Sequence, residues 1–75
     1  MNPLQFYSDL LIKKYDKVTL TRTELAKELN ISVSTLERLI EKNTLNIRYK
    51  REGNSQKARY VFPILEVANY LAFVA

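Results

Sequence analysis

The sequence contains no cysteine and no histidine, and these two absences remove most routes to catalysis and metal binding. Without cysteine, the chain has neither disulfides nor thiolate metal ligands. Without histidine, it lacks the commonest metal ligand and the commonest general base. Because Gly53 is the single glycine, no glycine-rich loop can surround a phosphate. The composition therefore predicts a protein that is not an enzyme, holds no metal or cofactor, and has no small-molecule ligand.

Long apolar runs are also missing from the chain. No stretch reaches the roughly 18 residues that a membrane-spanning helix requires. The N-terminus lacks the basic start and apolar core of a secretory signal peptide. We expect a cytoplasmic protein with no membrane contact, folded as one domain over residues 1–75.

Positive charge is concentrated in one segment. The chain has 12 basic and 8 acidic residues, for a formal net charge of +4. Five of the basic residues lie within residues 47–60 against Glu52 alone, whereas the remainder of the chain is balanced. A basic segment on a neutral scaffold is typical of a surface that binds a polyanion, although solvated charge runs that bind nothing are also common.

Residues 22–43 carry the pattern of a helix-turn-helix, in which one helix braces a second that enters a DNA groove. Ala26 lies where the two helices must approach closely, and Asn30 lies at the turn, where it tolerates a left-handed backbone. The apolar contacts that such a pair needs are supplied by Leu25, Leu29, Ile31, Leu36 and Leu39.

Capping residues predict where these two helices begin. Thr21 and Glu24 form a capping-box pair, so the bracing helix starts near Arg22. Ser32 caps the second helix, which we expect over residues 33–42 as the recognition helix.

Two further helices and a hairpin are predicted around this pair. A first helix, capped by Asn2, runs to about Tyr15, and a last helix opens at Pro63. Alternation after the recognition helix predicts a two-stranded wing over residues 47–60, with one apolar and one basic side. A four-residue turn at 52–55 would place like charges opposite each other with no carboxylate between them: Lys50 with Lys57 and Arg48 with Arg59.

The fold class is therefore mainly α with a small β-hairpin, as a winged helix-turn-helix. Its expected order is an N-terminal helix, the helix-turn-helix pair, the wing and a C-terminal helix. The terminal helices carry more apolar surface than one small core uses, which suggests a homodimer or a cooperative assembly on DNA through them.

Double-stranded DNA is the expected partner. Arg38 is the best candidate for a base contact, because its guanidinium can bond guanine in the major groove. The wing cations would follow the phosphate backbone or enter the minor groove, with the polar tip beside them. The candidate DNA-binding residues are Arg22, Thr23, Ser32, Val33, Ser34, Thr35, Glu37, Arg38, Lys42, Arg48, Lys50, Arg51, Asn54, Ser55, Gln56, Lys57 and Arg59.

The run from Leu25-Ala26 through Asn30-Ile31-Ser32-Val33-Ser34-Thr35-Leu36-Glu37-Arg38-Leu39-Ile40 resembles the excisionase-type, MerR-like winged helix-turn-helix family. The resemblance covers about residues 19–72, with Asn30 in place of the usual turn glycine and Val33 where arginine is frequent. It implies a small phage, plasmid or mobile-element protein that is nucleoid-associated, and that regulates transcription or assists recombination as an excisionase.

Two alternatives stay open at this point. A protein-interaction module, such as an antirepressor or an assembly subunit, would use the apolar terminal helices as its binding surface. An RNA-binding protein would need exposed aromatic residues to stack unpaired bases. The wing aromatics are expected to face inward instead.

Overall fold

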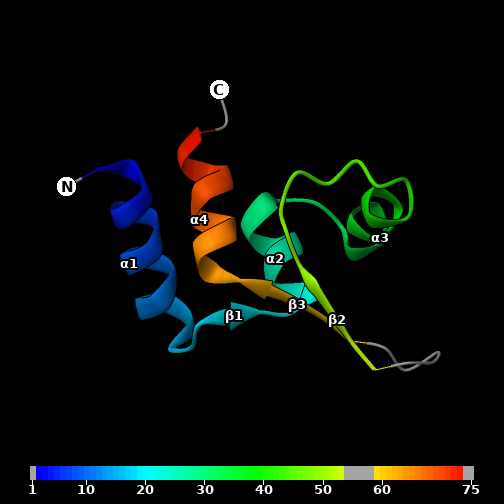
Figure 1. The fold of residues 1–75 in the computed structure, drawn as a ribbon, viewed down its shortest axis with the longest axis horizontal. Coiled ribbons are helices and arrows are strands. Elements are labelled where there is room, and N and C mark those ends of the chain that lie inside the picture. Colours follow the sequence, from blue (N-terminus) through cyan, green and yellow to red (C-terminus); the bar gives the residue numbers. More distant parts are fainter. Residues whose placement is uncertain (1, 54–58, 74–75) are drawn as a thin grey trace.

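Four helices and three strands follow one another in the computed structural model, which describes residues 2–53 and 59–73. Figure 1 shows α1 and α4 side by side at one end, α3 at the other, and the sheet beneath them. The elements, in chain order, are α1 (Pro3–Tyr15), β1 (Thr19–Leu20), α2 (Arg22–Leu29), α3 (Val33–Glu41), β2 (Lys50–Glu52), β3 (Arg59–Pro63) and α4 (Ile64–Phe73).

The predicted caps begin the first three helices. The side chain of Asn2 accepts the Gln5 backbone N–H at 2.8 Å, so α1 starts at Pro3. Thr21 and Glu24 form the complete capping box of α2. The α3 helix ends at Glu41, one residue before the predicted end, with Lys42 as its C-cap.

The turn between α2 and α3 has the predicted left-handed residue. Asn30 adopts φ 60° and ψ 43°, and its backbone N–H points back to the Ala26 and Lys27 carbonyls. The next N–H, from Ile31, also bonds to the Ala26 carbonyl, at 3.0 Å. Ala26 is buried, so the small residue lies where the chain folds back most tightly. The helix-turn-helix geometry is confirmed.

The sheet has three antiparallel strands in the order β1-β3-β2, so β1 joins the two strands of the predicted wing. The predicted register was wrong: Lys50 lies opposite Val61, and Arg59 lies opposite Glu52, so a carboxylate does face one of the cations. Glu52 is itself the last residue of β2, so residues 52–55 do not form the predicted four-residue turn. At the other end of β3, Leu20 pairs with Phe62 and both side chains are buried.

The observed pairing of β2 with β3 differs from the predicted one by an even number of residues. The same side chains therefore share a face in both. The Tyr49 ring packs edge-on against Tyr60, with centroids 5.4 Å apart, and lies 5.6 Å from the Phe62 ring. The predicted apolar side of the wing is therefore present. Ile47 precedes β2 and is buried in the core rather than paired within the hairpin.

The core joins all four helices to the sheet. Helix α4 begins at Ile64, one residue after the predicted position, because Pro63 is still paired with Thr19. The Ile64 N–H completes the junction by bonding to the Val18 carbonyl at 2.9 Å. Buried apolar residues are Leu11, Leu20, Leu25, Ala26, Leu36, Ile40, Ile47, Phe62, Ile64, Val67 and Ala68.

Helix α1 is tied to α2 through one carboxylate. Glu28 accepts hydrogen bonds from Lys14 Nζ, at 2.6 Å, and from the Tyr15 hydroxyl. Partial burial raises the pKa of the Glu28 carboxyl, but these two hydrogen bonds outweigh it and hold the pKa below its usual value. Burial, together with the hydrogen bond to Glu28 and the neighbouring carboxylate charges, raises the pKa of Tyr15 to about 12.

Among the described residues, no helix is both long enough and apolar enough to cross a bilayer.

Truncation of Leu36 tests whether the buried face of α3 holds that helix in place. Leu36 has 0% exposure, so Leu36→Ala should lower the free energy of unfolding by about 2–5 kcal/mol. The matched variant Leu65→Ala removes the same atoms from a side chain that is 64% exposed. It should change the free energy of unfolding by less than about 0.5 kcal/mol. Urea unfolding measures both, and equal losses would contradict the assigned core.

The Glu28 contacts predict a pH dependence of stability. A carboxyl whose folded-state pKa is lowered stabilises the fold above its unfolded-state pKa, and this contribution is lost as the pH falls through the folded-state pKa. Glu28→Gln should therefore reduce stability at neutral pH, with a difference from wild type that shrinks in acid. Urea titrations between about pH 7 and pH 2 measure it. Asp9→Asn, on the exposed surface of α1, is the control and should show a smaller difference at neutral pH.

Candidate nucleic-acid interface

Helix α3 has one buried face and one exposed face. Leu36 and Ile40 are buried beneath it. Ser34, Arg38 and Lys42 are exposed and follow one another at intervals of four residues, which places them in a row along the helix. The sequence predicted a wider outward face, which also included Val33 and Glu37.

Side chains in the first turn of α3 make more contacts within the protein than the sequence indicated. The Ser32 hydroxyl accepts the Thr35 backbone N–H at 3.1 Å and donates to the Thr35 hydroxyl at 2.9 Å. Thr35 still has its own hydroxyl proton to donate outward. Val33, which was placed on the outward surface, is partly buried against the core. Of the predicted residues in this turn, Ser34 is thus the most freely presented.

The start of α2 meets α3 and the wing through Arg22. Its guanidinium bonds the Glu37 carboxylate, with Nη1 and Oε2 2.5 Å apart, and lies 5.5 Å from the centre of the Tyr60 ring. Sequence reasoning proposed Arg22 and Glu37 as separate DNA contacts and missed that they bind each other. Fifteen residues separate them, so no local spacing rule could have paired them. Thr23, beside Arg22, is exposed at the helix start.

The wing cations are divided between two faces. Arg51 lies opposite Tyr60, on the face that contacts Arg22 and therefore looks toward α2 and α3. Lys50 and Arg59 lie on the other face by the alternation of the strands. The sequence predicted one basic side of the wing with Arg48, Lys50, Lys57 and Arg59; Lys50 and Arg59 do share a face, and it is not the face on which Tyr60 contacts Arg22.

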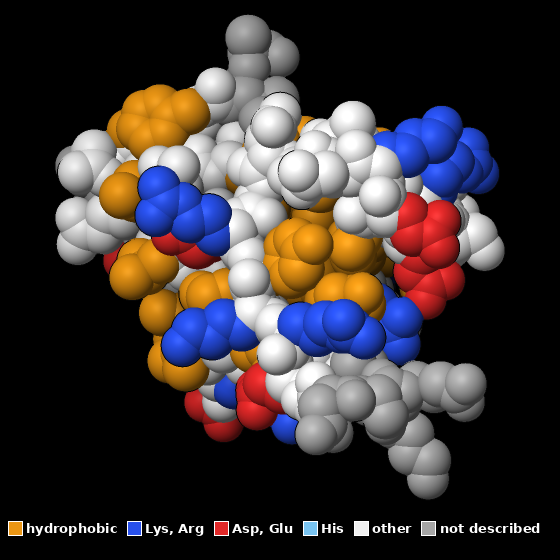
Figure 2. Space-filling model, turned by 45° about the vertical axis from the view of Figure 1, so that its right-hand side comes forward, with side chains coloured by type: hydrophobic (Ala, Val, Ile, Leu, Met, Phe, Trp, Pro, Cys, Tyr) orange, Lys and Arg blue, Asp and Glu red, His pale blue; other side chains and the backbone are white. Residues whose placement is uncertain are grey.

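Figure 2 shows one face of the molecule with its side chains coloured by type. Lys and Arg side chains form a row below an apolar area, and Asp and Glu side chains lie beside one end of that row. Neighbouring carboxylates make this face mixed in charge rather than uniformly basic. The phosphates of a duplex bound here would contact cations that have carboxylates beside them.

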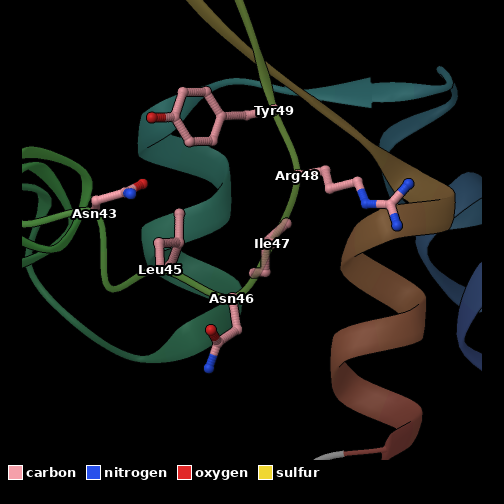
Figure 3. Close-up of a pocket in the computed structure, with 6 residues that line it drawn as sticks. All are labelled: Asn43, Leu45, Asn46, Ile47, Arg48 and Tyr49. Atoms are coloured by element: carbon pink, nitrogen blue, oxygen red, sulfur yellow. The ribbon is translucent and has the colours of Figure 1, made fainter.

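Arg48 belongs to a different part of the surface. Its side chain is 90% exposed and lies 3.8 Å from Glu66 of α4, too far for a hydrogen bond. Figure 3 shows it pointing toward α4, opposite to Tyr49 and away from the segment that leaves α3. The described chain therefore does not place Arg48 with the α3 row.

The segment between α3 and β2 forms a hollow that sequence reasoning did not anticipate. Its volume is about 490 Å³, and Figure 3 shows the side chains around it: Asn43, Leu45, Asn46, Ile47, Arg48 and Tyr49. Sequence reasoning assigned the last three of these residues to the wing and the others to the connection before it, so no signal marked the hollow. Asn54, Ser55, Gln56 and Lys57, the predicted tip residues, lie outside the described residues.

A helix-turn-helix pair followed by a sheet-anchored hairpin defines the chain as a winged helix-turn-helix domain. Residues 8–74 match the family described as pyocin activator protein PrtN, and the chain belongs to this family. No curated protein matches the chain, and neither does any solved structure.

This family consists of phage-related transcriptional activators. The expected kinship with phage regulators is therefore confirmed at that level. The match does not single out the excisionase-type, MerR-like family that the helix-turn-helix residues resemble.

Proposed function

We propose that the chain regulates transcription for a phage or related element by binding double-stranded DNA sequence-specifically. Helix α3 enters the major groove, and the wing follows the neighbouring minor groove or backbone. The observation that supports this most is the exposed row of Ser34, Arg38 and Lys42 on a helix whose other face is buried. The family match favours transcriptional regulation over the excisionase role.

Each member of the row suits a different contact. Arg38 lies in the middle, where a guanidinium can bond the O6 and N7 atoms of guanine. Ser34 in the first turn and Lys42 at the C-cap lie at the two ends, where a groove-bound helix meets phosphates. The row therefore provides a base contact between two positioning contacts.

Cations lie on both faces of the two-stranded wing. This arrangement suits a wing that approaches the duplex with its own edge in front. Such a wing has a phosphate backbone on either side, so Arg51 on one face and Lys50 with Arg59 on the other each reach a strand. Glu52, opposite Arg59, offsets part of that charge. Phosphate contacts of this kind add affinity without adding sequence information.

Protein interaction is the second candidate function, and exposed apolar side chains favour it. Phe6 and Leu10 are four residues apart on α1 and about half exposed, and Leu65 and Phe73 are more exposed still on α4. Exposed apolar clusters often mark protein contacts. In the DNA-binding proposal the same surfaces join copies of the chain on neighbouring sites.

Selection from a random duplex pool, followed by binding at several salt concentrations, tests the DNA-binding proposal. If five to seven phosphates are neutralised, the logarithm of affinity should fall with a slope of about −4.5 to −6 against the logarithm of salt concentration. A flat response, or a pool without enrichment, would count against DNA binding.

A pair of charge reversals supplies the control for that experiment. Lys50→Glu with Arg51→Glu should abolish duplex binding, because both residues lie in the wing. Lys13→Glu with Lys27→Glu makes the same change in net charge on exposed positions of α1 and α2, and should retain most of the affinity. If the protein acts only through its terminal helices, the wing reversal would leave partner binding intact.

Self-association through the terminal helices is measured by sedimentation equilibrium without DNA. The wild type should associate reversibly at high micromolar concentration, and Phe6→Ser with Leu10→Ser should weaken this association, because both side chains are exposed on α1. A wild type that stays strictly monomeric would remove the assembly proposal and leave DNA binding to single copies.

A further inference from the structure

The Arg22 guanidinium lies where the bracing helix, the recognition helix and the wing meet. It bonds Glu37 of α3 on one side and stacks near Tyr60 of β3 on the other. A hollow of about 230 Å³ beside the pair is lined by Arg22, Glu37, Ile40, Glu41 and Tyr60. Space for another group is therefore present next to the ion pair.

The ion pair is exposed to solvent, so exchanging one partner costs little. The side chains of Arg22 and Glu37 keep 38% and 45% of their exposure, and exposed pairs contribute little to folding stability. A guanidinium bonds carboxylate and phosphate oxygens with the same geometry. A phosphate at the start of α2 can therefore replace Glu37 as the partner of Arg22 without disturbing the core.

We propose that Glu37 occupies Arg22 in the free protein as a stand-in for a DNA phosphate, and that this pairing suppresses binding to non-cognate duplex. The inference rests on the proposed function, whose binding site it deepens. While Glu37 holds Arg22, the pair is neutral, so Arg22 adds no net attraction to phosphates.

Cognate DNA reverses this arrangement. When α3 seats fully in the major groove, a phosphate reaches the start of α2, where backbone N–H groups favour it, and takes Arg22. The released Glu37 carboxylate then accepts a hydrogen bond from the amino group of a cytosine. A non-cognate duplex does not seat α3, so it gains neither contact and meets only the neutral pair.

The test compares Glu37→Gln with Glu41→Gln. Both variants remove one negative charge from α3, and the two residues line the same hollow one helical turn apart, but Glu37 alone of the two pairs with Arg22. Binding is measured by fluorescence anisotropy with the selected duplex and a scrambled duplex of equal length. Glu37→Gln should bind the scrambled duplex about fivefold or more tighter than Glu41→Gln does, with a salt slope steeper by about 0.9 for the added phosphate contact.

A second variant, Arg22→Gln, approaches the exchange from the other side. It should weaken binding to the selected duplex about tenfold or more and weaken binding to the scrambled duplex by a clearly smaller factor, because only the selected duplex loses a direct contact with Arg22, whereas both duplexes meet the unpaired Glu37 carboxylate. An ordinary phosphate contact would weaken both duplexes alike. Thermal unfolding of each variant confirms that it is folded at the assay temperature.

The outcomes separate this inference from the proposed function. Equal effects of Glu37→Gln and Glu41→Gln, or a uniform loss in Arg22→Gln, would overturn the exchange while DNA binding stands. A wild type that binds neither duplex would overturn both. The expected pattern, with discrimination reduced by Glu37→Gln and affinity for the selected duplex reduced by Arg22→Gln, would establish Glu37 as a specificity-determining residue.

Discussion

Burial of Phe62 is the constraint on which the arrangement of the binding surface depends. This side chain has no exposed surface, it pairs across the sheet with Leu20, and its ring packs near Tyr49. Because β1 leads directly into α2, the pairing fixes β3 relative to the helix-turn-helix. The strand that carries Phe62 also carries Arg59 and Tyr60, so the same contact sets where the wing cations lie.

The aromatic residues and the cations compete for the space beside the recognition helix, and the aromatic residues occupy it. Tyr60 turns toward Arg22, and the alternation of the strand then sends Arg59 to the opposite face. Arg22 is held against α3 by its ion pair with Glu37. A surface that looks uniformly basic in the sequence is therefore a mixed surface in the fold, which favours selective over indiscriminate attraction to phosphates.

Local features were predicted well because their causes are local. A side-chain cap or a left-handed turn residue involves atoms within four residues of each other, as at Thr21, Asn30 and Ser32. The exposed row on α3 follows from helical spacing alone. The hairpin register was wrong because it assumed that the turn begins at Glu52, whereas Glu52 is still paired in β2, with Arg59 as its partner.

The sequence by itself determined the class of fold, the beginnings of the first three helices and the exposure of Ser34, Arg38 and Lys42 on α3, since periodicity and capping chemistry act within single helices. Tertiary structure alone decided which charges are neighbours. The pairing of Arg22 with Glu37, the position of Glu52 opposite Arg59 and the turn of Arg48 toward α4 all depend on how separate segments pack. The physical reason is that burial of apolar side chains positions the backbone, and the backbone positions determine which long charged side chains can reach each other.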